Sequence, residues 1–376
     1  MSPFRFEILH ISTKSGARVG RIHTPHGIIE TPNFVAVGTN GTLKALDNQA
    51  VANIGLQLMF CNTYHLLLQP GTEVIQQAGG IHNFINRKLP IITDSGGFQV
   101  FSLAYGSVAS ELKSKGTKKG GGSVLKITND GVLFRSYRDG KKILLTPETS
   151  IAAQKALGAD IIIPFDELPP YHISEEKLLY SLHRTHEWEK RSLDEHLKNP
   201  QRQAIYAVIH GGIDHSLRKI SCDFLSNLPF DGFAIGGSMG KTKREMVEML
   251  SVTIPRLPKE SPNHLLGIAD LESLRECVPL GIDTFDSSYP TKAARHGMLF
   301  TMKGNINITK GIYADQFTPI EKECNCQTCQ SYTLAYLHHL FKAKELTALT
   351  LASIHNLHFM VELMNQYRKD IILNII

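Results

Sequence analysis

The sequence carries carboxylates directly after several short apolar runs. Asp94 follows one such run, Asp166 and Glu167 end a second, and Asp286 ends a third. A single Asp after a strand is usually a turn former or a helix cap. Three such positions meeting at one edge favour a pocket for a small molecule or a base, because paired glycines at 211–212 and 236–237 also allow close backbone approach.

A second group of residues has the spacing of a metal site. Cys324, Cys326 and Cys329 fall within six residues, and His355 follows 26 residues after the last of them. Three thiolates and one imidazole satisfy tetrahedral Zn²⁺ with no open position, which is typical of a structural site. We therefore expect one structural Zn²⁺ per chain, although His338, His339 and His358 are alternative fourth ligands. A helix is expected over 331–347, and His355 is expected near the start of another.

The elements that must position these residues read as an alternation of strands and helices. Continuous apolar runs suit buried parallel strands, and helical signals separate several of them. Helices are predicted over 150–157, 174–197 and 241–250. Thr146-Pro147-Glu148 resembles an N-cap with Pro at the first helical position and leads into the first of them. The pattern predicts an α/β protein with a (β/α)₈ TIM barrel, and a doubly wound open sheet is the alternative. The apolar runs are 33–38, 57–62, 90–94, 160–166, 204–210, 232–237, 264–269 and 281–286.

Two further segments lie outside this alternation. Residues 4–32 read as short antiparallel strands, and 113–145 reads as an inserted loop and hairpin with several lysines and two Asp-Gly turns. The insertion is either plain surface or a basic patch that contacts phosphate. We expect a catalytic barrel domain over 1–300, including these segments, and a zinc-binding helical subdomain over 301–376 packed on the barrel.

Composition limits the class of protein. The chain has 376 residues, 42% of them apolar, and a formal net charge of +5, which permits an anionic partner without requiring one. It has no apolar stretch long enough for a membrane span and no signal peptide, so we expect a cytoplasmic protein with no membrane partner. The isolated Cys61, Cys222 and Cys277 are expected to be ordinary buried thiols.

These motifs together resemble a known family. The sequence is similar, essentially end to end, to the bacterial-type tRNA-guanine transglycosylases, the queuine tRNA-ribosyltransferases. The resemblance implies a pentosyltransferase that exchanges guanine at the wobble position of tRNAs with GUN anticodons for a free 7-deazaguanine base. It also implies a homodimer. The motifs that carry it are Asp94-Ser-Gly-Gly-Phe-Gln99, Phe165-Asp-Glu167, Gly236-Gly237, Phe285-Asp286, Pro290-Thr291, Arg295-His-Gly297 and the cysteine cluster with its later histidine.

The resemblance also implies roles for individual residues. Asp286 would be the nucleophile that forms a covalent ribosyl-enzyme intermediate, and Asp94 would be the general acid and base. Asp166 would bind the N1–H and 2-amino edge of the base, and the Gly237 backbone N–H would serve O6. The other residues assigned are Phe98 and Leu266, which would sandwich the ring, His210 near O6, and Lys292, Arg295 and His296, which would contact RNA.

Several departures from the family pattern surround the base pocket. His210 stands where the family usually has Gln, and Leu168 where many bacterial members have Cys. The loop Gly236-Gly-Ser-Met-Gly240 is one residue shorter than usual, which removes a branched side chain near the 7-substituent. The loop favours queuine over preQ1 as incoming base, whereas Leu168 favours preQ1 because it adds bulk. A non-catalytic tRNA-binding subunit and an unrelated barrel glycosidase are the alternative functions.

Overall fold

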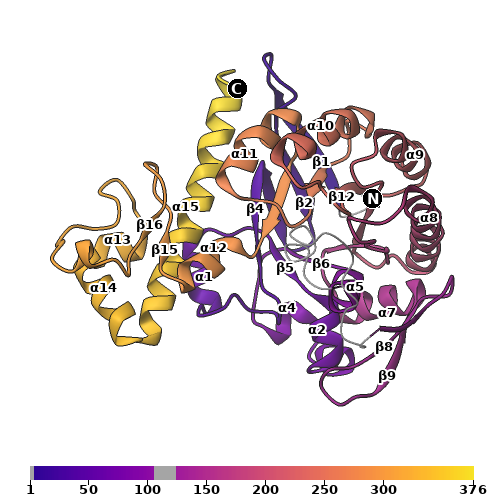
Figure 1. Cartoon of the computed structure of the whole chain (residues 1–376), viewed down its shortest axis with the longest axis horizontal. Helices are drawn as coiled ribbons and strands as arrows, with labels where there is room; N and C mark the ends of the chain where they lie inside the picture. The colour runs from indigo at the N-terminus through magenta and orange to yellow at the C-terminus, as the bar shows by residue number, and fades with distance from the viewer. Residues whose placement is uncertain (1–3, 106–123) are drawn as a thin grey trace.

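In the computed structural model, which describes residues 4–105 and 124–376, eight parallel strands close into a barrel. The order around the barrel is β4-β5-β6-β10-β11-β12-β13-β14, and β14 pairs with β4 to complete it. Figure 1 shows the barrel with the C-terminal region beside it. The closed barrel confirms the predicted TIM architecture and excludes the open sheet. The strands are β4 Asn33–Val37, β5 Met59–Cys61, β6 Ile91–Thr93, β10 Ile161–Ile162, β11 Ala204–Ile209, β12 Gly232–Ile235, β13 Asn263–Leu265 and β14 Thr284–Ser287.

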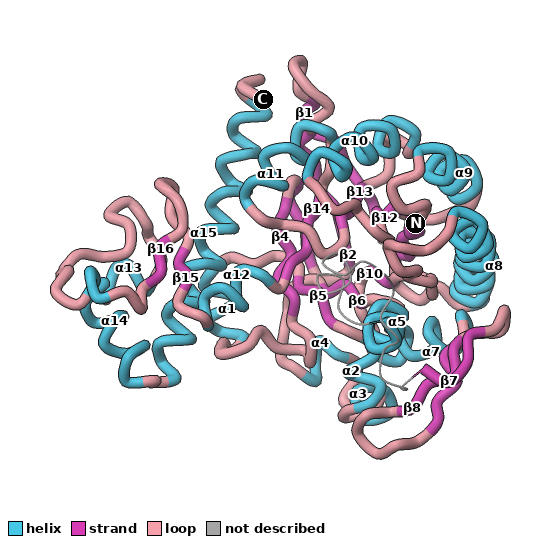
Figure 2. The backbone as a smooth tube through the Cα atoms, in the orientation of Figure 1, coloured by secondary structure: helices cyan, strands magenta, loops and turns pink. Residues whose placement is uncertain are grey.

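Helices cover the outside of this barrel (Figure 2). The predicted helices are confirmed at α7, α8 and α10, with ends shifted by a few residues. Thr146 caps α7 and Thr242 caps α10, each by accepting the backbone N–H three residues on. The helices are α1 Asn48–Ile54, α2 Thr63–Leu68, α3 Thr72–Gln77, α4 Ile81–Phe84, α5 Gly97–Tyr105, α7 Pro147–Leu157, α8 Glu175–Lys198, α9 His215–Leu225, α10 Lys243–Thr253, α11 Leu271–Cys277 and α12 Tyr289–Arg295, with short 3₁₀ turns η1 Ile254–Arg256 and η2 Val278–Leu280.

Antiparallel sheets are added to the barrel. The N-terminal sheet contains β1 Arg5–Ile11, β2 Arg18–Thr24 and β3 Gly27–Thr31, as predicted. The inserted segment forms a three-stranded sheet rather than a single hairpin: β7 Val124–Ile127, β8 Val132–Arg135 and β9 Lys142–Leu145. Both predicted Asp-Gly turns are used, and two turns give three strands. The lysines at 113–119 lie outside the described residues.

The C-terminal region leaves the barrel after α12 and returns as a long helix. It contains β15 Met298–Leu299, β16 Ile306–Asn307, η3 Gly311–Tyr313, α13 Gln327–Ser331, α14 Leu334–Ala343 and α15 Leu346–Ile372. The single helix expected over 331–347 is wrong, because Lys344 takes a left-handed conformation (φ 59°) and separates α14 from α15. His355 lies well inside α15 rather than near its start.

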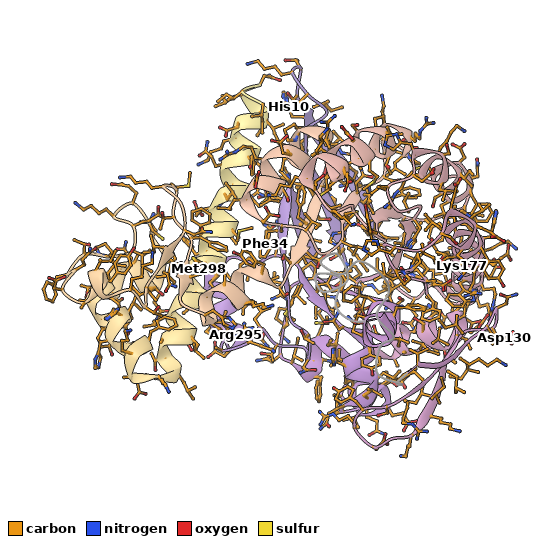
Figure 3. All side chains as sticks on the ribbon, viewed as in Figure 1. His10, Phe34, Asp130, Lys177, Arg295 and Met298 are labelled. Carbon is orange, nitrogen blue, oxygen red and sulfur yellow. The ribbon has the colours of Figure 1, made fainter. Side chains whose placement is uncertain are left out.

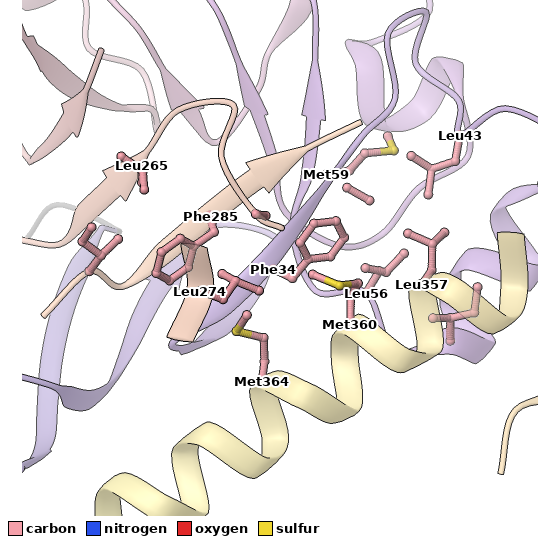
Figure 4. Close-up of a cluster of buried hydrophobic side chains, with 14 of the residues drawn as sticks. Phe34, Leu43, Leu56, Met59, Leu265, Leu274, Phe285, Leu357, Met360 and Met364 are labelled. Carbon is pink, nitrogen blue, oxygen red and sulfur yellow. The ribbon is translucent and has the colours of Figure 1, made fainter. Parts of the chain in front are cut away.

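Helix α15 packs directly on the barrel. Met360 and Met364 point from it toward Phe34 on β4 and Leu274 on α11 (Figure 4). These side chains are buried, and they belong to one apolar cluster that also includes Phe285 of β14. Burial of this kind stabilises the fold by about 1.5–3 kcal/mol for each large side chain. The C-terminal region is therefore anchored over the closing strands of the barrel, and the division at residue 300 stays a prediction.

None of the helices in residues 4–105 and 124–376 combines the length and apolar character needed to cross a membrane.

Candidate active site and metal cluster

The predicted site residues stand at the carboxyl ends of the barrel strands, where enzymes of this fold place their active sites. Asp94 follows β6, Asp166 follows β10 and Asp286 lies in β14. His210 directly follows β11, Gly236 follows β12 and Leu266 follows β13. One rim of the barrel therefore carries all of them, as the strand-end argument predicts.

Asp94 is a buried carboxyl with several hydrogen-bond donors, the Gln99 side chain among them. Asn62 donates to it through Nδ2 at 2.6 Å, Thr63 through its backbone N–H at 2.7 Å and Gly96 through its backbone N–H at 3.2 Å. Burial raises the pKa of Asp94 to about 6, although these hydrogen bonds favour the charged form and oppose the rise. A carboxyl that titrates near neutral pH can both release and accept a proton.

Asp286 is held in a different way. The imidazole Nε2 of His264 lies 3.1 Å from its Oδ1, and the Gly267 backbone N–H donates to the same oxygen at 2.8 Å. Its side chain is 9% exposed. Among the described residues both donors meet Oδ1 and none meets Oδ2. One carboxylate oxygen is thus anchored, and the other accepts no hydrogen bond from the described residues.

Asp166 and His210 meet each other directly. His210 Nε2 lies 2.9 Å from Asp166 Oδ2, and the Ser95 hydroxyl donates to Asp166 Oδ1 at 3.0 Å. His210 is buried, and its own backbone N–H donates to Ser221 Oγ at 3.1 Å. The imidazole of His210 is therefore paired with the carboxylate assigned to the base edge, a contact that the sequence did not predict.

A cavity of about 260 Å³ opens beside this pair. Its walls include Glu167, His210, Gly237 and Ser238, together with apolar side chains of the loop before α8 and of α8 itself. Gly237 has φ +77°, and a Cβ there would come within 3.0 Å of His210 Nδ1, so only glycine fits at this close approach. Neither Asp94 nor Asp286 is part of the cavity wall.

The residues assigned to the base faces differ in exposure. Phe98, in the first turn of α5, is 49% exposed, which argues against simple core packing for this ring. Leu266 is partly buried and packs against the barrel-interior cluster. A half-exposed aromatic ring at the active-site end of a barrel is available for stacking.

The residues assigned to RNA contact lie on or just after α12. Lys292 and His296 are exposed, and Arg295 is partly buried. The Arg295 Nη1 is buried and has no hydrogen-bond partner among the described residues. Arg295 projects where the barrel meets the C-terminal region (Figure 3).

The predicted metal ligands come together in the C-terminal region. The sulfurs of Cys324, Cys326 and Cys329 lie 3.8, 3.6 and 3.4 Å from His355 Nδ1. His355 Nε2 lies 2.8 Å from the Phe300 carbonyl, to which it donates. That bond turns the Nδ1 lone pair toward the sulfurs. The four residues form a group that could hold a metal ion. His338 instead has Nδ1 2.7 Å from the Ile308 carbonyl.

A second histidine group lies at the opposite end of the barrel. His26 Nδ1 and His82 Nε2 lie 2.8 and 3.0 Å from the two oxygens of Asp160, which precedes β10. Their rings stack with centroids 3.5 Å apart. Two imidazoles on one tetrahedral ion would hold their centroids about 5 Å apart, given metal–nitrogen bonds of about 2 Å. This group is therefore a cluster of two histidines around one carboxylate rather than a metal site.

Sequence reasoning missed His264, Asn62 and Ser95 as partners of the three carboxylates. Ser95 lies within the Asp94 motif, so its proximity was foreseeable. His264 begins an apolar run, and no motif in the sequence marks it as a functional residue. Its alternation with Leu265 in β13 is the one hint that it faces the same side as Asp286.

The fold and site define an enzyme of the (β/α)₈ class with acidic groups at the strand ends and a separate Cys₃His group. The model of the queuine tRNA-ribosyltransferase family matches residues 13–374. A protein named queuine tRNA-ribosyltransferase from Protochlamydia amoebophila is 71% identical to this chain, over 99% of this chain and 96% of the relative. A protein of the same name from Chlamydia felis is 58% identical, over 98% of each chain. A third, from Chlamydia trachomatis serovar D, is 56% identical over 98% of each chain. The chain belongs to the queuine tRNA-ribosyltransferase family and is a transferase.

Proposed function

We propose that this protein exchanges guanine at the wobble position of tRNAs with GUN anticodons for a 7-deazaguanine, through a covalent bond between Asp286 and the ribose. The observation that carries the proposal is the arrangement of the Asp286 carboxylate. Its Oδ1 is fixed by His264 and Gly267, and its Oδ2 has no donor among the described residues. Such a carboxylate can capture the positively charged carbon that forms when an N-glycosidic bond breaks.

Asp94 is the acid and base in this proposal. Its proton would pass to guanine as the C1′–N9 bond breaks, and its carboxylate would accept the N9 proton of the incoming base. The buried setting that raises its pKa to about 6 suits both roles.

This assignment predicts the pH dependence of the second step. Since the carboxylate must accept a proton, the rate at which the incoming base discharges the intermediate should fall as pH drops below about 6. Asp94→Asn should lower this rate by about 10²–10⁴-fold and remove the ionisation from the profile. Rapid-mixing measurements from pH 5 to 8 test it. An unchanged ionisation near pH 6 in the variant would assign the profile to another group.

Base recognition would use Asp166, His210 and Gly237, with Phe98 and Leu266 on the two faces of the ring. Asp166 Oδ2 is already paired with His210, so guanine N–H donors would replace or share that bond. A carboxylate left without a donor on desolvation costs free energy, so the His210 contact keeps Asp166 satisfied before the base arrives.

Queuine is the incoming base that we propose in preference to preQ1. The cavity beside Gly237 and Ser238 has a volume of about 260 Å³ and combines apolar walls with polar side chains such as Glu167 and Asp214. Such a cavity suits the bulky, hydroxylated cyclopentenediol of queuine better than a small aminomethyl group. Leu168 packs with the neighbouring cluster around Trp188 rather than lining that cavity, which weakens its argument for preQ1.

Separate incubations with guanine, preQ1 and queuine test the substrate. With tRNA carrying labelled guanine at the wobble position, we expect release with guanine and with queuine, and at least about tenfold slower release with preQ1. Faster release with preQ1 would overturn the queuine preference alone. No release with any base would overturn the transglycosylase function.

We propose that the Cys₃His group holds one structural Zn²⁺. With metal–sulfur bonds of about 2.3 Å and a metal–nitrogen bond of about 2.0 Å, tetrahedral geometry places sulfur and nitrogen about 3.5 Å apart. The separations of 3.4–3.8 Å from His355 Nδ1 fit that value. When bound, the ion would join the loop before α13 to α15; it supplies no reacting group in the mechanism.

RNA contact and self-association complete the proposal. Lys292, Arg295 and His296 would meet the phosphates or bases of the anticodon loop, which a salt-dependent loss of tRNA affinity would test.

Exposed apolar side chains in the C-terminal region support a homodimer, among them Phe317 and Leu346, each 77% exposed. Sedimentation as a 41.8 kDa species at micromolar concentration would contradict the dimer. We place the protein in the cytoplasm with its tRNA.

A further inference from the structure

We propose that His264 is a positioning residue for Asp286, which aims the free carboxylate oxygen at the ribose and stabilises the carboxylate as it leaves. The proposal rests on the function proposed above and adds a residue to it. His264 has no part in the recognition motifs, and its neighbours on β13 are apolar or amide side chains.

The position of His264 is set by the strand register. His264 on β13 pairs with Thr284 on β14, and Asp286 is two residues further along β14 on the same face. The imidazole therefore lies between a hydroxyl and a carboxylate. Its Nδ1 is 2.8 Å from Thr284 Oγ1 and its Nε2 is 3.1 Å from Asp286 Oδ1.

The contacts define which nitrogen carries the proton toward Asp286. A carboxylate only accepts, so Nε2–H donates to Oδ1. The ring itself is fully buried and stacks on Phe60, with centroids 6.1 Å apart and an angle of 20° between the planes. A ring held on its face and at both nitrogens has little freedom to rotate, so the direction of the donated bond is fixed.

Two N–H donors on one oxygen make the two oxygens of Asp286 unequal. Gly267 N–H and His264 Nε2–H both meet Oδ1, at 2.8 and 3.1 Å. The Oδ2 atom is then the nucleophile. In the first step its lone pair forms the bond to C1′ while the C1′–N9 electron pair leaves with guanine, which takes a proton from Asp94.

The same donors act in the second step. In the ester, Oδ1 is the carbonyl oxygen and still accepts both N–H groups. When N9 of the incoming base attacks C1′, the C1′–Oδ2 bond breaks, its electron pair returns to the carboxylate, and the N9 proton passes to Asp94. Negative charge develops on the carboxylate in this step, and donors aimed at developing charge lower the barrier.

The test compares three variants of the full chain. His264→Phe keeps a ring in the site and removes the donor. We expect kcat to fall by about 10²–10³-fold, as for other single donors to a developing oxyanion, while KM for tRNA changes less than about threefold. His264→Gln offers an amide donor and should recover at least about tenfold of the loss. Thr284→Val removes the other partner of the ring and should cost about tenfold.

A second readout separates positioning from packing. The covalent tRNA–protein adduct, trapped by denaturation and then challenged with guanine before the quench, should discharge more slowly in His264→Phe than in the wild type. Folding is checked by the melting temperature. If the Phe variant does not fold, the kcat and discharge rates of His264→Gln and Thr284→Val test the positioning role instead.

The outcomes are distinguishable. Wild-type kcat and discharge rate in a folded His264→Phe would overturn the inference, as would equal losses in the Phe and Gln variants. A wild-type protein that neither forms an adduct nor releases guanine would overturn the proposed function itself, whatever the variants do.

Discussion

Asp286→Asn is expected to lower the rate of guanine exchange by at least about 10³-fold and to leave no covalent adduct with tRNA, because an amide oxygen is a far weaker nucleophile than a carboxylate. The substitution keeps the size of the side chain and an oxygen that can accept the Gly267 N–H. We therefore expect tRNA affinity and melting temperature to change little. Release of labelled guanine from tRNA under single-turnover conditions measures the effect.

The matched control is the same substitution at the other end of the barrel. Asp231 precedes β12, and its carboxyl accepts the backbone N–H of Ile205 at 2.9 Å, a bond that an asparagine oxygen can also accept. Asp231→Asn should exchange guanine within about twofold of the wild-type rate. A full-rate Asp286→Asn protein would remove Asp286 from the chemistry.

The second large effect concerns the metal. Cys326→Ser should lose the ion proposed for this site, because Cys326 is one of the four residues that could hold it, and tetrahedral zinc needs all four. Without the ion, the loop before α13 is no longer tied to α15. We expect a loss of about 3–5 kcal/mol of stability, which corresponds to roughly 4–6 °C in melting temperature for a chain of this size.

Elemental analysis and thermal melting measure this prediction together. The wild type should contain one zinc per chain and Cys326→Ser none. Cys222→Ser is the control, since Cys222 is equally buried but lies on α9 within the barrel; it should keep its zinc. Iron or no metal in the wild type, or a Cys326→Ser protein that melts with the wild type, would contradict a structural zinc.

Much of the fold was predictable because parallel barrel strands are buried on both faces. Their sequences are continuous apolar runs that end in polar residues, as at Asp94 and Asp286, and their alternation with helices is visible without any structure. The ends of individual helices were harder to predict. The break between α14 and α15 occurs at Lys344, a non-glycine residue in the left-handed region, which no composition rule marks.

The site was predictable in its residues but not in their pairing. The carboxylates and the cysteine cluster have spacing that carries chemical meaning, so sequence alone marks them as candidates, and their roles stay predictions. The contacts of Asp166 with His210 and of Asp286 with His264 depend on the register between neighbouring strands, which the sequence does not state. For the same reason the sequence could not tell that one oxygen of Asp286 is anchored.

The most direct test of the account is to locate the covalent bond between the protein and tRNA. The wild-type protein is incubated with GUN-anticodon tRNA, denatured, and digested with protease and nuclease, and the ribosylated peptide is sequenced by mass spectrometry. The account predicts a single ribose adduct on Asp286 and none in the Asp286→Asn protein. An adduct on Asp94 or Asp166, or guanine exchange with no adduct at all, would contradict it.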